Sequence, residues 1–215
     1  MLVLVFACRK EIKASLGSNR PPVFECSTPW KIGHRQCLLM LCGQGPLSAF
    51  QTLRLFLTQQ QGVSGVLNMG LAGAYNAQDW VLGQPALVSH EIWPEDERVP
   101  ADDLFANHLA LWGRELALDP VSTAARMELC LPTAKIVRAV TVNQPSTTQR
   151  SEKLRNLADV ENMEGFALAL ACQAAAIPFL EIRTIANFCG ETDRNKAGFS
   201  RACPALHKTL SELGF

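Results

Sequence analysis

Two glutamates and one asparagine occupy positions where side chains of their kind can do chemistry. Glu11 follows the apolar start of the chain, Glu164 separates "ADVENM" from an apolar helix-like run, and Asn187 ends the run "PFLEIRTIAN". A carboxylate that faces a pocket offers acceptors for the paired hydroxyls of a sugar, or a base that orients a water molecule. A buried amide must find hydrogen-bond partners and can donate to the edge of a ligand.

Each of these residues also has a purely structural explanation. An acid in the first turn of a helix meets the positive end of the helix dipole and contributes about 0.3–1 kcal/mol. Glu11 and Glu164 both precede segments with a helical pattern. Asn187 can find its partners within the fold. Taken one at a time, the residues leave a structural role and a ligand-binding role open.

Two further motifs offer groups that could contact a ligand: backbone N–H groups and the thioether of a methionine. In "NMGLAGAY", Gly70 to Gly73 follow a strand-like run, so that the N–H groups near Leu71 and Ala72 can approach a ligand. A plain tight turn explains the same residues. Met163 precedes Glu164, and its thioether can pack against a flat ring or a sugar face.

The segment "GQGPLS" at residues 43–48 is close to a dinucleotide-binding fingerprint. Its third glycine is missing, and the next strand-like run, "GVLNM", ends without the acid that would hold a ribose hydroxyl. The segment therefore favours a tight strand-to-helix turn over a cofactor site.

Composition excludes several classes of protein. The chain has 215 residues, 48% of them hydrophobic, and a net charge of zero, which argues against binding to nucleic acid or to an anionic membrane. We expect no signal peptide, because the apolar start turns charged after about eight residues and lacks a basic leader. The eight cysteines form no C-x-x-C pair. We therefore expect a cytoplasmic protein with no metal and no cofactor.

The positions of the motifs follow from the predicted elements. Strand-like runs at 2–7, 36–42, 65–69, 84–90, 134–142 and 178–187 alternate with helical patterns at 47–60, 104–118, 164–176 and 200–213, the last with Ser200 as its N-cap. This alternation predicts one domain over residues 1–215, a three-layer α/β/α sandwich around a mixed, largely parallel sheet. Ligands bind beyond the carboxyl ends of strands in such folds, so the four motifs should share one pocket.

Together, four stretches resemble the purine nucleoside phosphorylase and nucleosidase superfamily: "VLVFACRKEI", "GVLNMGLAGAYNAQDWVLGQPALVS", "ADVENMEGFALA" and "PFLEIRTIAN". The resemblance implies cleavage of the N-glycosidic bond of a purine nucleoside through an oxocarbenium-like transition state. It implies that Glu164 binds the ribose hydroxyls, Met163 packs on the sugar and Glu11 positions the attacking water. The backbone of Ala72 and Gly73 would line the sugar and base site, and Glu161 would be structural or support the site from behind.

The chain departs from its relatives at two positions of this pattern. Relatives that cleave adenine nucleosides carry aspartate where this chain has Asn187. An amide cannot protonate the base, but its NH₂ group can donate to a 6-oxopurine, which favours hypoxanthine as the leaving base. Asp193 or Glu191 would be substitute acids. The other departure is Leu71, where many relatives have serine or another small polar residue.

Phosphorylases need arginines around phosphate. Arg9 is near the expected place, but "GLAGA" supplies none, so water is the favoured acceptor. Within the superfamily the chain is most similar to the futalosine hydrolases, which release hypoxanthine from futalosine in menaquinone biosynthesis. The benzoate on the sugar side of that substrate would meet Arg9, Arg150 or Arg183.

Three alternatives stay open: a methylthioadenosine/S-adenosylhomocysteine-type nucleosidase, a purine nucleoside phosphorylase, and a module that binds nucleosides without catalysis. The expected partner is a small-molecule purine nucleoside, and the resemblance implies a homo-oligomer, with a dimer as the first expectation.

Overall fold

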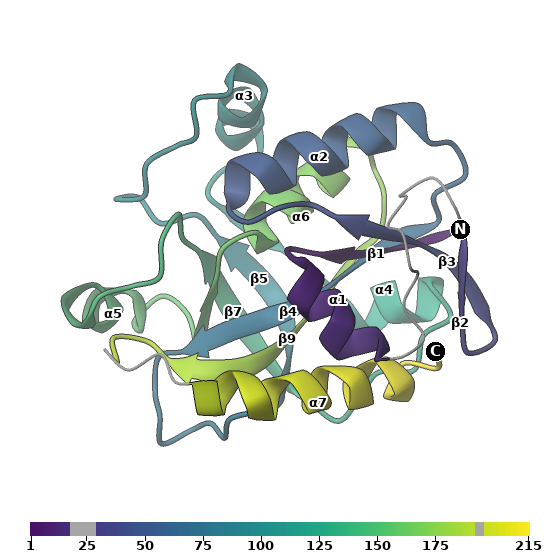
Figure 1. Cartoon of the computed structure of the whole chain (residues 1–215). Coiled ribbons are helices and arrows are strands. Elements are labelled where there is room, and N and C mark those ends of the chain that lie inside the picture. The colour runs from purple at the N-terminus through teal and green to yellow at the C-terminus, as the bar shows by residue number, and fades with distance from the viewer. Residues whose placement is uncertain (18–28, 192–195) are drawn as a thin grey trace.

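The computed structural model describes residues 1–17, 29–191 and 196–215. Strands and helices alternate along these residues, as the sequence predicts (Figure 1). The strands are β1 (Leu2–Phe6), β2 (Trp30–Ile32), β3 (Arg35–Leu41), β4 (Gly65–Ala74), β5 (Pro85–Ile92), β6 (Glu115–Ala117), β7 (Lys135–Thr141), β8 (Val160–Asn162) and β9 (Phe179–Phe188). The helices are α1 (Arg9–Leu16), α2 (Pro46–Gln59), α3 (Asp103–Trp112), α4 (Pro120–Arg126), α5 (Thr148–Leu154), α6 (Gly165–Ala174) and α7 (Lys196–Glu212).

The strands form one mixed sheet that partly closes on itself. Its path runs β2-β3-β1-β4-β8-β7-β5-β6, and β9 pairs with both β4 and β5. The pairs β4–β9, β9–β5, β5–β7, β7–β8 and β8–β4 therefore complete a ring of five strands. The sandwich predicted from the sequence is correct, and the ring is a feature that the alternation of elements does not reveal. It brings the ends of β4, β8 and β9 close together.

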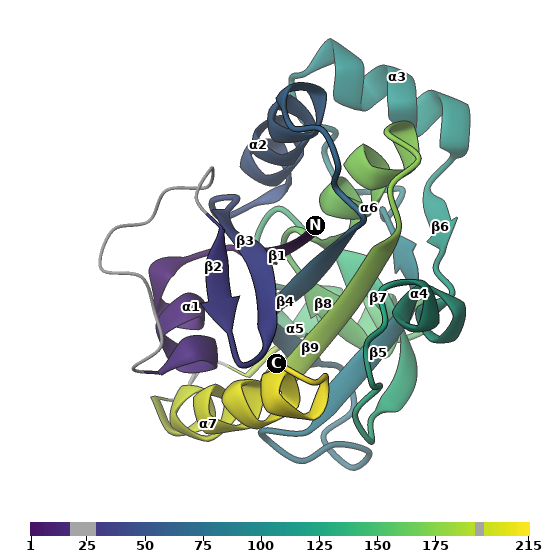
Figure 2. The same ribbon diagram turned by 90° about the vertical axis from the view of Figure 1, so that its right-hand side faces the viewer.

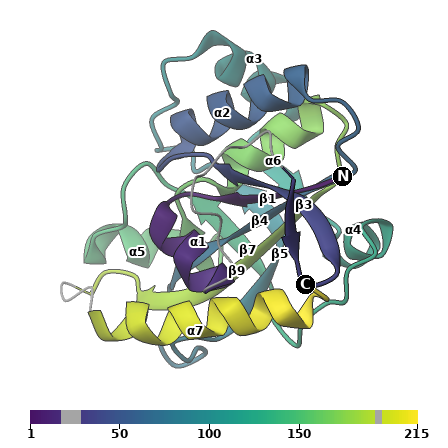
Figure 3. The same ribbon diagram turned by 45° about the vertical axis from the view of Figure 1, so that its right-hand side comes forward.

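Helices cover both faces of the sheet. One layer holds α2, α3 and α6, and the opposite layer holds α1, α4 and α7 (Figures 1 and 3). The alternation of side chains along β1 serves both layers, because Val3 and Val5 pack in the first core and Leu4 and Phe6 in the second. The nearly all-apolar α6 is buried against α2, which Figure 2 shows from the side.

The glycine-rich "GLAGA" is not the turn that its composition suggests. Residues 70–74 continue β4, whose last part pairs with β9 on one side and with Gly73↔Glu161 and Ala74↔Val160 of β8 on the other. Small residues suit this position because two strands and the side chains below them approach closely. The register shifts between Ala72 and Gly73, so the strand carries an irregularity beside the cavity described below.

Two helix boundaries also differ from the prediction. The helix expected over 104–118 ends at Trp112, because Gly113 takes a φ of 81° and the chain turns into β6, which pairs with β5. Ser200 is not an N-cap, because α7 already begins at Lys196. The short helix α4, capped by Asp119, was not predicted.

Seven cysteines are described, and none of these forms a disulfide. Cys37, Cys42 and Cys172 are buried as the sequence suggests, whereas Cys130 is exposed. Within the described ranges, no helix is long and apolar enough to cross a membrane.

Candidate active site

All seven residues singled out in the sequence line one cavity of about 240 Å³: Glu11, Leu71, Ala72, Gly73, Met163, Glu164 and Asn187. They come from the start of α1, the last part of β4, the β8–α6 junction and the end of β9. The rest of the lining is Ala7, Cys8, Gln44, Val142, Pro145, Glu161, Asn162, Ala186 and Phe199. Together these elements form one concave surface that carries the carboxylates of Glu11, Glu161 and Glu164 and the amide of Asn187.

Glu11 is held by backbone donors from two strand ends. Its Oε2 accepts from the N–H groups of Ala7 at 3.0 Å and Cys8 at 3.2 Å, and its Oε1 accepts from Leu71 at 3.1 Å. The side chain is 6% exposed and lines the cavity. It therefore caps the start of α1 and also presents a carboxylate to the cavity, so both roles considered from the sequence are present in one residue.

Glu164 precedes α6 but does not cap that helix with its side chain. Its Oε1 accepts from Gly45 N–H at 3.0 Å, and its Oε2 lies 3.9 Å from Arg183 Nη1. Burial raises the pKa of Glu164 to about 7, although the charge on Arg183 acts in the opposite direction. The carboxyl group is therefore poised to change its charge near neutral pH.

Asn162 does the capping instead. Its Oδ1 accepts from Glu164 N–H at 3.0 Å and from Gly165 N–H at 2.6 Å. Gly165 is needed at this position because a Cβ there would lie 2.2 Å from Glu91 Oε1 and 2.5 Å from Glu181 Oε1. The glycine of "MEG" therefore makes room for buried carboxylates under the helix start, while Asn162 sets the direction in which Glu164 leaves the backbone.

Arg183 lies beneath the cavity, fully buried between carboxylates. Its Nε donates to Glu181 Oε1 at 2.6 Å. A Cβ at Gly70 would sit 2.6 Å from Arg183 Nη1 and 2.9 Å from Glu11 Oε1, so this glycine leaves room for the guanidinium beside the Glu11 carboxylate. The buried cation offsets part of the negative charge that Glu11 and Glu164 bring to the cavity.

Asn187, near the end of β9, is half-buried in the lining of the cavity. Its Nδ2 makes a long hydrogen bond of 3.3 Å to the carbonyl of Phe188 and lies 3.0 Å from where a Gly73 Cβ would be. Glu161 lines the same cavity, where its carboxylate accepts from Tyr75 Oη and from the Ser146 N–H, both at 3.0 Å. Glu161 therefore ties the loop before α5 to the residue that follows β4, and it does so from within the lining of the cavity rather than from behind it.

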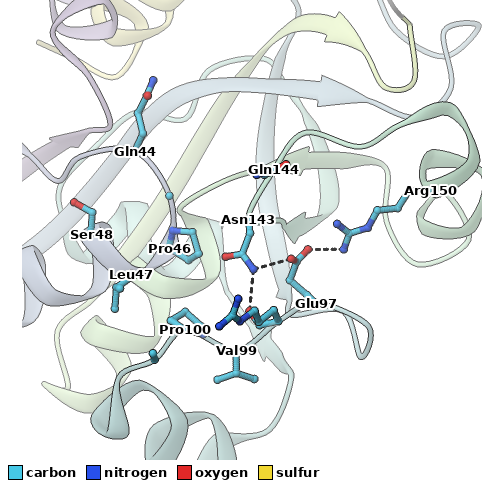
Figure 4. Close-up of a pocket in the computed structure, with 13 residues that line it drawn as sticks. Gln44, Pro46, Leu47, Ser48, Glu97, Val99, Pro100, Asn143, Gln144 and Arg150 are labelled. Carbon is cyan, nitrogen blue, oxygen red and sulfur yellow. Dashed lines mark hydrogen bonds and ion pairs between the residues drawn. The ribbon is translucent and has the colours of Figure 1, made fainter.

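A second cavity of about 520 Å³ adjoins the first and shares Gln44 with it (Figure 4). One wall is the start of α2, and the opposite wall is the loop around Val99. In Figure 4, Glu97 lies between Asn143 and Arg150: its Oε1 accepts from Asn143 Nδ2 at 2.7 Å, and its Oε2 pairs with Arg150. Since Gly45 lines this cavity and also donates to Glu164, the two cavities meet at the α2 N-terminus.

Sequence reasoning missed the supporting residues of the site. Gly45 donates to Glu164 across 119 positions of the chain, and only the pair of glycines in "GQGP" marks a special backbone there. Asn162 carries a sequence signal, because asparagine before a helix is a common capping residue. Arg183 was considered only as a partner for a substrate carboxylate. No group of three or more His, Cys, Asp or Glu in the described part of the chain is placed to hold a metal ion.

Comparison with known proteins agrees with this architecture. A family model for the phosphorylase superfamily matches residues 30–213. No curated protein matches the chain significantly.

Among solved structures, the 5′-methylthioadenosine/S-adenosyl homocysteine nucleosidase of Campylobacter jejuni has a TM-score of 0.73 at 15% identity, over 98% of this chain and 95% of its own. A futalosine hydrolase mutant of Helicobacter pylori has a TM-score of 0.71 at 16% identity, over 99% and 97%. A putative nucleosidase of the former type from Borrelia burgdorferi, bound to adenine, has a TM-score of 0.73 at 17% identity, over 99% and 98%. At these identities the likeness to the solved structures shows the fold, and the family match over residues 30–213 shows that the chain belongs to the phosphorylase superfamily.

Proposed function

We propose that this chain hydrolyses the N-glycosidic bond of a purine nucleoside. The observation that carries the proposal is a cavity whose lining includes the buried carboxylates of Glu11 and Glu164 together with the amide of Asn187. Membership of the phosphorylase superfamily supports it. In the reaction the bond between the sugar and the base breaks, its electron pair leaves with the base, and a water oxygen bonds to the sugar carbon.

Glu164 and Met163 are proposed to hold the sugar. Gly45 N–H occupies one acceptor position on Glu164 Oε1, which leaves the remaining lone pairs of the carboxylate for two neighbouring hydroxyls. The ionised form is the better acceptor, because a protonated carboxyl gives up one lone pair to its proton. Met163 is half-buried in the lining, where its thioether can lie against the sugar ring.

Glu11 is proposed to position the water molecule. A carboxylate has about four acceptor positions, and three backbone N–H groups take three of them. The position left on Oε1, where only Leu71 N–H donates, can accept a hydrogen bond from water. That bond orients the water oxygen and lets Glu11 take its proton as the new bond to the sugar forms.

Asn187 is proposed to bind the base. Its long bond to the Phe188 carbonyl leaves the NH₂ group able to turn toward a ligand oxygen or nitrogen, and such a bond to a charged leaving base contributes about 1.5–3 kcal/mol. An amide donates to the 6-oxo group of hypoxanthine more readily than to the 6-amino group of adenine.

Two residues were considered as a substitute general acid for the leaving base. Glu191 is exposed and is not part of the lining, and Asp193 lies outside the described residues.

Water is favoured over phosphate as the acceptor. Among the described residues, those that line the cavity include no arginine or lysine. Arg183 lies below the floor, where it is already bonded to Glu181 and close to Glu164. A phosphate dianion would therefore meet carboxylates rather than cations, which is unfavourable.

The specific nucleoside is proposed to be futalosine. Arg150 is the one of the three candidate arginines that lines the second cavity, which has room for a ring-bearing substituent of the sugar. Its guanidinium already meets Glu97 and Asp96, while Arg183 is buried and Arg9 is exposed at the start of α1. If Arg150 meets the benzoate, Arg150→Met should raise the KM for futalosine about tenfold and leave that for inosine unchanged.

A methylthioadenosine/S-adenosylhomocysteine-type nucleosidase is the second candidate, and the solved structures with that activity in their names favour it to the same extent. The test is to incubate the purified protein in phosphate-free buffer with futalosine, inosine, methylthioadenosine and S-adenosylhomocysteine. Chromatography then identifies the base released. Hypoxanthine from futalosine supports the proposal, and adenine from the thio-nucleosides supports the second candidate.

Release of base only after phosphate is added would indicate a phosphorylase. No release from any nucleoside would point to a module that binds without catalysis. We further propose that the protein is cytoplasmic and that it acts as a homodimer. Light scattering coupled to size-exclusion chromatography would measure its molar mass and so test the homodimer.

A further inference from the structure

Four carboxylates and one guanidinium are buried beneath and beside the cavity: Glu11, Glu91, Glu164, Glu181 and Arg183. Glu91, on β5, is completely buried and is not part of the lining of either cavity described above. Glu91 has no role in the proposed hydrolysis. A fully buried acid of this kind costs free energy unless it is paired or protonated.

The charges around Glu91 favour its protonated form. Glu181 takes the hydrogen bond from Arg183 Nε, whereas Glu91 has no ion pair in the described part of the chain. One oxygen of Glu91 and one of Glu181 both lie within 2.5 Å of the point where a Gly165 Cβ would sit, so these oxygens are within about 5 Å of each other. Two buried carboxylates at that separation do not both ionise readily.

The hydrogen bonds point the same way. Thr141 Oγ1 lies 2.8 Å from Glu91 Oε2 and 3.1 Å from Asn162 Oδ1, and it accepts from Phe166 N–H at 2.7 Å. A hydroxyl has only one proton, which cannot serve both Glu91 and Asn162. If Glu91 is protonated, it donates to Thr141, and the hydroxyl of Thr141 donates to Asn162, so all three contacts become hydrogen bonds.

The orientation of Asn162 is fixed by its other contacts. Its Oδ1 must face the N–H groups of Glu164 and Gly165. This leaves Nδ2 to donate to Glu91 Oε1 at 2.5 Å and, over a longer distance of 3.4 Å, to Glu181 Oε1. Glu91 therefore holds the amide that caps α6 and places the backbone of Glu164. A chain of direct contacts connects this buried acid to the residue that would bind the sugar.

We propose that Glu91 is a positioning residue that stays protonated in the folded protein and, through Asn162 and Thr141, fixes Glu164 for nucleoside binding. The part of this inference that concerns Glu164 rests on the proposed function, whereas the protonation of Glu91 does not.

The environment of Glu91 acts in the same direction. Burial raises the pKa of Glu91 well above its ordinary value, and the charge of Glu181 raises it further. The hydrogen bonds that Thr141 and Asn162 would donate to an ionised Glu91, and the charge on Arg183, oppose this rise without reversing it. These four residues come from β7, β8 and β9, which surround the Glu91 side chain.

Infrared spectroscopy tests the protonation without any substrate. At pH 9 the carboxyl of Glu164 is ionised, so a protonated carboxyl stretch that shifts in D₂O should remain in the wild type and in Glu164→Gln. It should disappear in Glu91→Gln. Absence of the band from the folded wild type at pH 9, or its persistence in Glu91→Gln, would overturn the assignment.

Kinetics test the positioning role. Glutamine resembles a protonated glutamate, since its NH₂ can donate to Thr141 and its oxygen can accept from Asn162. Glu91→Gln should therefore keep kcat/KM within about threefold of the wild type, whereas Glu91→Met should lower it about tenfold to a hundredfold, because small displacements of a substrate-holding group are costly. The loss should appear with a raised KM in protein whose circular dichroism is that of the wild type.

An unchanged kcat/KM in folded Glu91→Met would refute the positioning role, and an equal loss in both variants would refute the need for a neutral side chain. If Glu91→Met does not fold, the infrared band and the retained activity of Glu91→Gln still decide the matter. If no nucleoside is cleaved by any variant, the proposed function fails while the infrared result continues to test the protonation of Glu91.

Discussion

Replacement of Glu164 by glutamine should change how the stability of the protein depends on pH. The pKa of Glu164 is raised from an ordinary value of 4.5 to about 7, mainly because the carboxyl group is buried. Between these two values the unfolded chain ionises while the folded protein keeps its proton. The free energy of unfolding therefore falls as the pH rises from about 4.5, and the decrease is complete once the pH exceeds about 7.

The difference between the two pKa values corresponds to about 3 kcal/mol of unfolding free energy, since each pH unit is worth about 1.4 kcal/mol. Glu164→Gln has no proton to lose at this position. Relative to the wild type, it should gain about 3 kcal/mol of stability between pH 4.5 and pH 8. Urea unfolding followed by tryptophan fluorescence at four pH values measures this gain as a relative midpoint shift on the order of 1 M.

The comparison uses the change of unfolding free energy with pH, not its absolute value. It therefore removes any effect of glutamine that does not depend on pH, such as its contact with Arg183. Glu152→Gln is the matched control, because Glu152 is exposed on α5 and should leave the wild-type pH dependence unchanged. If Glu164→Gln and the wild type lose stability in parallel from pH 5 to pH 8, the carboxyl group is not held in the buried state described here, and the reasoning about its charge fails.

Three other substitutions give sharp expectations. Glu11→Gln should lower base release by about a hundredfold or more in folded protein, because an amide is a poor base for the attacking water; a near-normal rate would remove Glu11 from the site. Asn187→Asp should shift the ratio of cleavage rates toward 6-aminopurine nucleosides, and an unchanged hypoxanthine-to-adenine ratio would refute the assignment of base recognition. Gly165→Ala should destabilise the protein by about 1–3 kcal/mol or more in urea unfolding, since its Cβ would fall 2.2 Å from Glu91 Oε1, and a stability equal to the wild type would show that the helix start can move aside.

The sequence indicated the cavity because its chemistry is local to strand ends. Glu11, Glu164 and Asn187 each stand at a junction between an apolar run and a turn or helix, and parallel strands bring such junctions to one edge. That rule needs no knowledge of which strand pairs with which. It therefore placed residues 176 positions apart in one cavity, although it could not tell whether Glu11 caps a helix or faces the cavity, and the structure shows that it does both.

The features that sequence reasoning missed depend on long-range pairing. Residues 70–74 look like a turn because they contain two glycines, yet β8 and β9 hold them in a strand. Two contacts of the site also join distant parts of the chain. Gly45, just before α2, donates its N–H to Glu164, and Glu91 contacts Asn162 across 71 positions. Periodicity and local propensity carry no information about such partners.

Cleavage of a nucleoside in water enriched with ¹⁸O tests the central claim most directly. The substrate is the nucleoside that is cleaved fastest among the four tested for base release. It would be incubated without phosphate with the wild type and with Glu164→Gln. Mass spectrometry would then measure the masses of the products. The account predicts one ¹⁸O atom in the sugar product, none in the base, and a rate for Glu164→Gln that is lower by about a hundredfold or more. A sugar phosphate formed only when phosphate is added, or equal rates for the two proteins, would contradict it.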